Sequence, residues 1–255
     1  ARRLAAMQPR PRRVMVGDAG AIPYLSEIPV LDGLGLGGYR GMPFARASVH
    51  GLPAVIELIE RMPIDERPDV LALYPGWWPG IADVFGRPID RVKITGNVIC
   101  GGDEKVVYAA DWSALDAPHT PTEQTAELDV ADLVDERAYD FRFPAPYGGW
   151  IVDAILLTPD GKRRWDAGRI VPVAEHVSWK LDPPRAGVVR LRSDRPARVT
   201  FVAKRIDGTT VKSEILLEAR AADHWIDADV RLDGPSSEIE VFALTTLRLH
   251  HVWML

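Results

Sequence analysis

The spacing of apolar residues changes near residue 120, and this change constrains the fold more than any other feature of the sequence. Before that point, short apolar runs typical of buried strands alternate with runs spaced at three and four residues, as in amphipathic helices. After it the apolar spacing is two, with turn residues between the runs. The 255-residue chain is therefore predicted to hold an α/β domain over 1–118 and an all-β domain over 119–255.

The first domain is predicted to contain a mainly parallel sheet with helices on its faces, closed by an edge hairpin. Buried strands are expected in "RRVMVG", "IPVLD" and "PDVLALYP", and further strands in "DRVKITG" and "EKVVYAAD". The spacing in "ASVHGLPAVIELIERM" predicts one amphipathic helix over 47–62, with Ser48 as its cap. A short helix in "GWWPGIADVFG" is expected to end at Gly86. A polar segment with two prolines around residue 120 predicts a linker.

The second domain is predicted to be an antiparallel β-sandwich, jelly-roll-like in type. Turn pairs at Asp160–Gly161 and Asp207–Gly208 each separate two apolar runs, which is a hairpin pattern. Proline-rich turns are expected between the short strands of "WKLDPPRAGVVRLRSDRPARVTF". Buried tryptophans in this half would only stabilise it, whereas exposed ones could contact carbohydrate.

Composition and charge exclude several functional classes. A net charge of −5 argues against a nucleic-acid partner, because phosphate binding needs a basic surface. The arginine-rich opening over 1–13 is expected to be a solvated or membrane-proximal segment rather than a nucleic-acid arm. One cysteine, Cys100, excludes an internal disulfide and a cysteine-rich zinc site, and its apolar setting predicts a buried thiol. No apolar run in this sequence is long enough to span a membrane, and no signal peptide is visible in it.

The stretch "VMVGDAGAIPYLSEIPVLDGLGLGG" is the first candidate for chemistry. It offers Gly17 and Gly20 but not the full glycine pattern of a dinucleotide loop, and Pro23 stands where a helix should continue. Asp32 follows the second strand, where an acid often holds ribose hydroxyls. The structural alternative is a glycine turn in which Asp18 caps the next segment through backbone N–H groups. The later glycines are expected to form a flexible turn or lid.

Ligands of open α/β sheets bind at the carboxyl ends of the strands, and this edge holds the candidate ligand-binding residues. Trp77 and Trp78 follow the strand "PDVLAL" directly. Adjacent tryptophans suit stacking on a sugar ring, a membrane interface, or simple packing between domains, and the sequence leaves these open. The candidate ligand-binding residues are Asp18, Tyr24, Asp32, Trp77 and Trp78.

Catalytic and metal-binding residues are not predicted. The six histidines have no metal-ligand spacing on a helix, and the adjacent His250 and His251 are expected to point to opposite faces of a strand. No Gly-x-Ser-x-Gly turn occurs, and nothing selects a catalytic pair among the acids. We therefore expect no metal and no cofactor.

Three motifs, taken in order, resemble the region after the last membrane helices of bacterial polytopic glycosyltransferases of the GT-C class. These are "VMVGDAGAIPYLSEIPVLDGLGL", "RPDVLALYPGWWPGIADVFG" and "VVYAADWSAL", and the ending "LHHVWML" is similar to the closing domain of such proteins. The resemblance covers most of the chain. Such enzymes use polyprenyl-phosphate sugars, and their catalytic acid lies near the first membrane helices, so no catalytic residue is transferred.

The resemblance implies a soluble extracytoplasmic domain at the outer face of the plasma membrane, inactive alone. Its partners would be the membrane-embedded remainder of the same polypeptide and a cell-envelope glycan, without nucleic acid. The start at Ala1 without a methionine fits a piece of a longer protein. Two alternatives stay open. One is a free-standing enzyme that binds a nucleotide or nucleotide-sugar at the Gly17–Asp32 edge, and the other is a structural or assembly domain with Trp77 and Trp78 buried at a domain junction.

Overall fold

The computed structural model describes residues 1–18, 20–96, 101–115, 126–143, 149–158, 161–219 and 221–255. Its internal contacts divide the chain into two compact units, Ala1–Pro118 (unit 1) and His119–Leu255 (unit 2), and each is considered by itself. The predicted linker around residue 120 and the predicted buried thiol of Cys100 lie outside the described residues. Within the described part of the chain, no helix is both long enough and apolar enough to cross a membrane.

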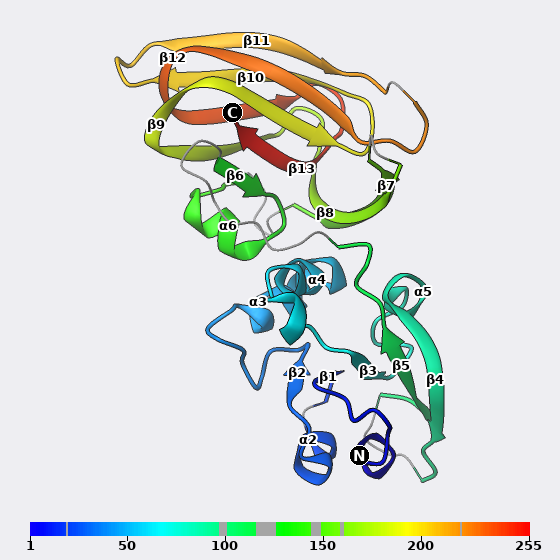
Figure 1. The fold of residues 1–255 in the computed structure, drawn as a ribbon. Helices are drawn as coiled ribbons and strands as arrows, with labels where there is room; N and C mark the ends of the chain where they lie inside the picture. The colour runs from blue at the N-terminus through cyan, green and yellow to red at the C-terminus, as the bar shows by residue number, and fades with distance from the viewer. Residues whose placement is uncertain (19, 97–100, 116–125, 144–148, 159–160, 220) are drawn as a thin grey trace. The chain divides into compact units, whose positions relative to one another are not determined.

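Unit 1 contains a five-stranded sheet in the order β2-β1-β3-β5-β4 (Figure 1). The β-α-β order and the edge hairpin are confirmed, but the sheet is mixed rather than mainly parallel. β1 pairs in parallel with β2 and β3, whereas β5 runs antiparallel to both β3 and β4. The strands span Val14–Val16 (β1), Val30–Asp32 (β2), Val70–Leu73 (β3), Gly86–Lys93 (β4) and Glu104–Ala110 (β5).

Helices cover both faces of this sheet. Leu4 and Ile22 pack with Val14 and Val16 on one face, and α3 and α4 lie on the other side of the sheet in Figure 1. Met15 points to that second face and is fully buried. The helices span Arg2–Ala5 (α1), Ala21–Ser26 (α2), Phe44–His50 (α3), Leu52–Glu60 (α4) and Ile81–Phe85 (α5), and a 3₁₀ turn spans Ile64–Glu66 (η1).

The prediction of one helix over 47–62 is wrong, because α3 and α4 meet at Gly51. This glycine has φ 106° and ψ 177°, a conformation that ends one helix and that a side chain would strain. Ser48, predicted to cap the helix, lies inside α3 and donates to the Ala45 carbonyl oxygen at 2.9 Å. The predicted helix end at Gly86 is confirmed by α5.

The opening segment is anchored on unit 1 by Leu4, and most of its residues, including Arg2, Arg3, Arg10 and Arg12, are exposed, as expected of a solvated stretch. Leu4 is buried in the core, and Arg3 pairs with Asp90 at 2.6 Å. Arg10 donates to the Ser26 carbonyl oxygen at 3.0 Å. These arginines neutralise or cap groups of their own unit.

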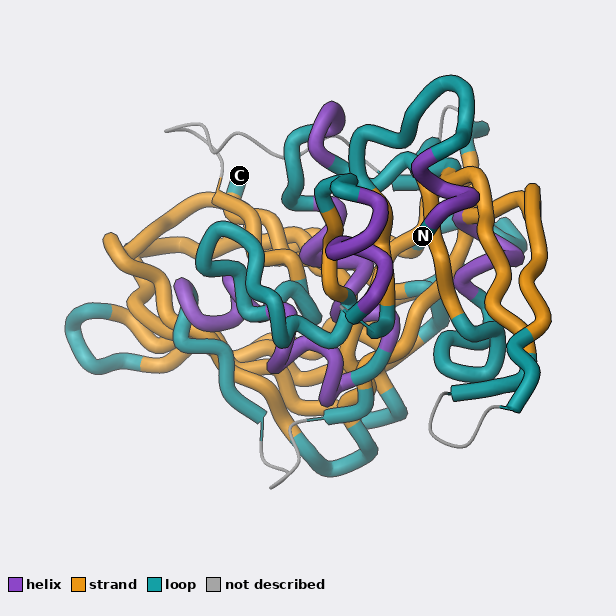
Figure 2. Tube along the Cα trace, turned by 90° about the horizontal axis from the view of Figure 1, so that it is seen from below, coloured by secondary structure: helices purple, strands orange, loops and turns teal. Residues whose placement is uncertain are grey.

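Unit 2 is an antiparallel β-sandwich made from one curled sheet, in the order β11-β10-β12-β9-β13-β8-β7, with β6 paired to β13 (Figures 1 and 2). The predicted β-sandwich and both predicted hairpins are confirmed, although Asp160 lies outside the described residues. The elements span Ala126–Asp129 (β6), Leu133–Ala138 (α6), Ile151–Leu157 (β7), Arg163–Val171 (β8), His176–Ser193 (β9), Ala197–Arg205 (β10), Thr210–Leu217 (β11), Ile226–Ala243 (β12) and Leu247–Met254 (β13).

The expectation of short strands is wrong for β9 and β12, which have 18 residues each. In the first half of β9, Lys180 pairs with Glu238 of β12, and at its last residue Ser193 pairs with Ile226 of β12. The register between the two strands shifts between these two stretches. The predicted proline-rich turn at Pro183–Pro184 instead lies inside β9. Each of the two long strands therefore belongs to both layers of the sandwich.

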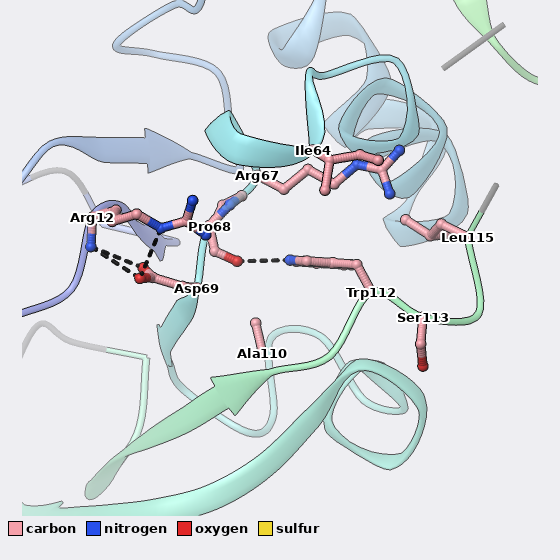
Figure 3. Close-up of a pocket in the computed structure, with 9 residues that line it drawn as sticks. All are labelled: Arg12, Ile64, Arg67, Pro68, Asp69, Ala110, Trp112, Ser113 and Leu115. Atoms are coloured by element: carbon pink, nitrogen blue, oxygen red, sulfur yellow. Dashed lines mark hydrogen bonds and ion pairs between the residues drawn. The ribbon is translucent and has the colours of Figure 1, made fainter. Parts of the chain in front are cut away.

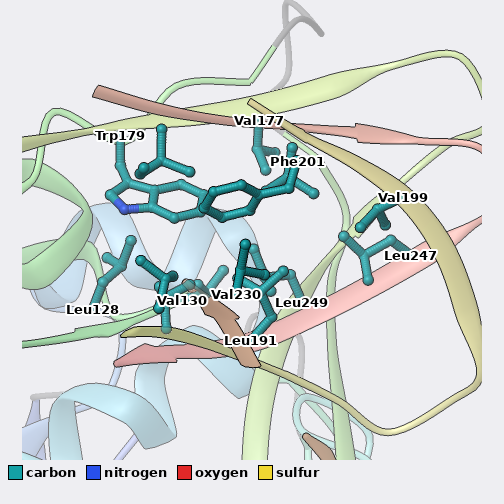
Figure 4. Packing of buried hydrophobic residues seen from close by; sticks show 14 of the residues in the cluster. Leu128, Val130, Val177, Trp179, Leu191, Val199, Phe201, Val230, Leu247 and Leu249 are labelled. Carbon is teal, nitrogen blue, oxygen red and sulfur yellow. The ribbon is translucent and has the colours of Figure 1, made fainter. Parts of the chain in front are cut away.

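The core of unit 2 lies between the layers and is almost wholly apolar. Trp179 is fully buried beside Val177 and Phe201, and Leu191 and Leu249 face them from the other layer (Figure 4). Side chains alternate between this core and the outer face along each strand, as the period-two pattern requires.

An ion pair is buried where α6 meets β8. The Arg169 guanidinium is 1% exposed and holds Glu136 with two hydrogen bonds, of which the Nη2 bond is 2.8 Å long. Glu136 also accepts from the Ala131 N–H at 3.0 Å. Loss of the carboxylate would leave a buried guanidinium without its counter-charge.

Replacement of Glu136 by alanine is expected to lower the free energy of unfolding of unit 2 by about 3–5 kcal/mol. Glu214→Ala is the matched control, because its pair with Arg198 is exposed and 3.5 Å long, and its removal should cost less than about 1 kcal/mol. Urea titrations of the two variants measure the difference, and equal costs would contradict this account of the buried pair.

Candidate functional sites

The carboxyl ends of β1 and β3 meet at one edge of unit 1, as the strand order predicts. After β3, a turn in which the Trp77 N–H donates to the Tyr74 carbonyl oxygen at 3.0 Å reverses the chain. This turn carries both tryptophans back over the loops that follow β1 and β2. Trp78 is buried, whereas the Trp77 side chain remains 39% exposed.

Glycines make room for the two indoles. A Cβ atom on Gly17 would lie 2.9 Å from Trp77 Cε3, and one on Gly101 would lie 1.8 Å from Trp77 Nε1. A Cβ atom on Gly33 would lie 2.4 Å from Trp78 Cη2. The indoles of Trp77 and Trp78 therefore pack directly on the backbone of glycines of the opening motif. They fill the space through which a pyrophosphate would approach that backbone.

Charged groups flank the exposed indole. Asp18 forms an ion pair with Lys105, whose ammonium group also lies 4.6 Å from the centre of the Tyr74 ring. Tyr74 and Trp77 are in ring contact, with centroids 5.1 Å apart. We call Gly17, Asp18, Tyr74, Trp77 and Lys105 the Trp77 site.

The two predicted acids have different environments. The N-cap residue of α2 is Gly20 rather than Asp18, so the predicted cap is wrong, and the carboxylate of Asp18 pairs with Lys105 instead. Asp32 is 4% exposed and accepts from the N–H groups of Leu34 at 3.0 Å and Gly37 at 2.9 Å. The glycine run after it is therefore folded around a carboxylate, as in an Asx turn.

The structure brings Asp18, Trp77 and Trp78 to one edge and buries Asp32 in a turn at that edge. Tyr24 is 84% exposed, on the side of α2 opposite the buried Ile22 and Ser26, so it points to solvent. Tyr74 and Lys105 are the members of the site that the sequence did not predict. Lys105 lies in the apolar strand "EKVVY", and this pattern predicts a strand but not its neighbour across the sheet.

An opening of about 390 Å³ lies in unit 1 at the end of β3 opposite the Trp77 site (Figure 3). Its polar groups bond to one another: Asp69 accepts from the Arg12 N–H at 3.0 Å, and the Trp112 indole donates to the Pro68 carbonyl oxygen at 2.6 Å. These bonds tie the ends of β1, β3 and β5 together. The polar groups of this opening thus have structural partners.

Unit 2 contains a cluster of ionisable side chains at the strands β6, β8 and β13. The expectation that His250 and His251 point to opposite faces of a strand is wrong, because both rings lie close to Asp166. The register of β13 shifts between Leu249 and Val252, and this shift breaks the strict alternation of side chains. His251 Nε2 lies 3.0 Å and His250 Nδ1 lies 3.6 Å from Asp166 Oδ2. We call the following residues the His251 cluster: Glu127, Asp129, Asp166, Asp194, Arg248, His250 and His251.

Carboxylates surround both imidazoles. His251 Nδ1 lies 3.0 Å from Glu127 Oε1, and His250 Nε2 lies 3.3 Å from Asp194 Oδ1. Arg248 Nη1 pairs with Asp194 at 3.0 Å. The groups form an alternating chain of acid and base that is almost closed to solvent.

The pKa values respond to this arrangement. Burial alone would lower the pKa of His251, but the charges of Asp166 and Asp129 outweigh it and raise the pKa well above its usual value. Burial would raise the pKa of Asp166, but the charge of His251 and the proximity of both imidazoles lower it. Burial would lower the pKa of His250, yet the carboxylates of Asp166 and Asp194 raise it.

The tryptophans of unit 2 are divided between core and surface. Trp179 and Trp165 are buried, and Trp150 is 82% exposed. Trp253 lies between the His251 ring, stacked at 4.9 Å, and the Arg192 guanidinium, 4.5 Å from its ring centre. That stack fixes the plane of the His251 imidazole.

The fold and the sites define a protein with an α/β unit that bears a half-exposed tryptophan edge and a β-sandwich unit that bears a histidine–carboxylate cluster. A family model described as a domain of unknown function, DUF8728, matches residues 1–140, and the chain belongs to that family. The match covers unit 1 and continues through β6 and α6, so it includes Glu127 and Asp129.

Solved structures similar to this chain are carbohydrate-binding modules. The C-terminal family 6 module of LamC from Zobellia galactanivorans has 12% identity and a TM-score of 0.28, over 51% of this chain and 97% of that one. A family 6 module of Clostridium stercorarium, solved with cellobiose, has 13% identity and a TM-score of 0.30, over 50% and 90%. No protein of curated function matches the chain in sequence. The description of unit 2 as a β-sandwich rests on its own strand pairing.

Gly33→Ala is expected to lower the free energy of unfolding of unit 1 by about 1–3 kcal/mol, because the added methyl group would overlap Trp78 and Met15. Gly20→Ala is the control, since a Cβ atom there meets nothing within 4 Å, and its effect should stay within about 0.5 kcal/mol. Differential scanning calorimetry measures both. A neutral Gly33→Ala would refute the role of this glycine in seating Trp78.

Proposed function

We propose that this chain is an accessory, extracytoplasmic part of a membrane-bound glycosyltransferase that uses polyprenyl-phosphate sugars, and that the Trp77 site holds a glycan of the cell envelope. In this proposal the partner of the chain is the membrane-embedded remainder of the same polypeptide. The place of action is the outer face of the plasma membrane. The reaction itself belongs to that remainder, and the chain acts by holding the acceptor.

The half-exposed indole of Trp77 is the observation that carries the glycan part of the proposal. A large aromatic ring held rigidly at a strand edge offers a flat apolar face, on which the C–H face of a sugar ring can pack. Asp18 can accept hydrogen bonds from hydroxyl groups and Lys105 can donate them, and such bonds to charged groups are the stronger ones.

The same geometry supports a glycan over a nucleotide. The backbone of Gly17 faces an indole, and the oxygens of Asp32 are bonded to Leu34 and Gly37. A pyrophosphate needs free backbone N–H groups, and a ribose needs an accessible acid. The nucleotide-dependent enzyme stays an alternative that the binding experiments below distinguish.

Isothermal titration with cell-envelope oligosaccharides tests the site. We expect Trp77→Ala to weaken binding about 30-fold, because an aromatic anchor of this kind is worth about 2 kcal/mol. Trp150→Ala removes an exposed tryptophan of unit 2 and should leave the affinity unchanged. The glycan site would be overturned if no oligosaccharide gave heat of binding. It would also be overturned if Trp77→Ala bound an oligosaccharide with the same affinity as the parent chain. A thermal shift with nucleotide-sugars that disappears in Asp32→Ala would favour the alternative.

The membrane part of the proposal rests on the order of the motifs from Val14 to Leu115 and has its own test. The coding sequence upstream of Ala1 should encode about ten or more apolar segments, each of about 20 residues. An upstream sequence without apolar segments would refute the membrane-bound parent and leave the glycan site to be judged by its binding data.

A further inference from the structure

We propose that Asp129, Asp166 and His251 form a binding site for a divalent transition-metal ion of the Zn²⁺ type in unit 2. Each residue offers one ligand atom, and these atoms all lie within 4.8 Å of one another. The site is separate from the Trp77 site, and the inference does not depend on the proposed function.

The three ligands come from three neighbouring strands. β8 pairs with β13 at residues 247–249 and β6 pairs with it at residues 251–254, both on the edge opposite β9, and His251 is the direct cross-strand partner of Asp129. His251 Nε2 and Asp166 Oδ2 are 3.0 Å apart, the separation of two ligands that subtend about 90° at an ion about 2.1 Å from each. Two ligands of a tetrahedral ion lie about 3.4 Å apart, and the Asp129 carboxylate, within 4.8 Å of the other two ligand atoms, can approach that separation by a rotation of its side chain.

Glu127 adds a supporting contact within the cluster. Its carboxylate lies 3.0 Å from Nδ1 of His251, the ring nitrogen turned away from Asp166. A carboxylate behind the far nitrogen of a ligating histidine fixes the tautomer and raises the basicity of the ligand. Trp253 stacks on the same ring with an interplanar angle of 10° and holds its orientation.

The charges around the site also favour a cation. Glu127, Asp129, Asp166 and Asp194 bring four carboxylates together, and Arg248 is the fixed cation of the cluster. The fully buried His250 directs Nδ1 at Asp166 from 3.6 Å, too far for a hydrogen bond. A divalent ion among these carboxylates would offset charge that burial makes costly.

The donor set selects the class of metal. One imidazole nitrogen with two carboxylate oxygens suits Zn²⁺, Mn²⁺ and Co²⁺, whereas Ca²⁺ and Mg²⁺ prefer oxygen ligands alone. Three protein ligands leave a coordination position for water.

Titration of the whole, chelator-treated chain with Zn²⁺ by calorimetry, and with Co²⁺ by visible absorption, tests the site. We expect one ion per chain, with a Co²⁺ spectrum that includes nitrogen ligation. Asp129→Asn and His251→Ala should each weaken binding at least tenfold, as should Glu127→Gln through its hold on His251. His224→Ala removes a histidine of unit 2 outside the cluster and should bind as the parent chain does.

Several outcomes would overturn the proposal. They are no saturable binding of Zn²⁺ or Co²⁺, binding that persists in His251→Ala, equal loss in His224→Ala, and tighter binding of Ca²⁺ than of Zn²⁺. Circular dichroism of each variant separates lost binding from lost folding. Asp129→Asn keeps shape and size at a partly exposed position, so its binding decides the question if His251→Ala fails to fold.

Discussion

The ladder between β9 and β12 is the interaction on which unit 2 depends. Two strands of 18 residues stay paired while they pass from one layer of the sandwich to the other, so the two layers are one hydrogen-bonded sheet. Residues 236–243 of β12 pair with β10, which in turn pairs with β11, and residues 189–193 of β9 pair with β13. The shift of register between Leu232 and Glu238 is where this curl is made. Because β13 is fixed by β9, the histidines of β13 have a fixed relation to β6 and β8.

In unit 1 the corresponding constraint is the close approach of indoles to backbone. Sequence reasoning located the strand ends correctly, because a parallel β-α-β order fixes which loops share an edge. It also placed Asp18, Trp77 and Trp78 at that edge. It could not predict that the Trp77 indole packs on Gly17 and the Trp78 indole packs on Gly33. A glycine needed for a positive φ and a glycine needed to leave space for a side chain look alike in sequence. Lys105 was not predicted because it is 87 residues away from Asp18 in the sequence. The antiparallel pairing of β5 with β3 brings it to this edge of the sheet.

The His251 cluster marks where pattern-based prediction stops. Period two correctly gave a sandwich, but it also put His250 and His251 on opposite faces, and a register shift in β13 breaks that rule locally. Asp166 and Asp129 lie in strands that become neighbours only through β13, so their distance from His251 is a property of sheet order. The short β6 and α6 carry no strong period, yet β6 provides Glu127 and Asp129. Sequence spacing alone gives no route to such a site.

A charge argument links the arrangement of this cluster to what it can bind. Four carboxylates at low exposure repel one another, so folding needs compensating positive charge. Arg248 pairs with Asp194, which also lies beside His250. Asp166 lies beside both imidazoles, whereas Glu127 and Asp129 lie beside His251. Burial opposes a charge on His251, but the charges of Asp166 and Asp129 outweigh it and raise the pKa of the imidazole, which favours a proton on Nε2 beside Asp166. A metal ion at the same place would take the lone pair of Nε2, displace that proton and bring two charges, with Glu127 still holding the other ring nitrogen. The feature that favours the imidazolium is therefore the feature that favours the metal, and proton and metal compete for a single position on His251.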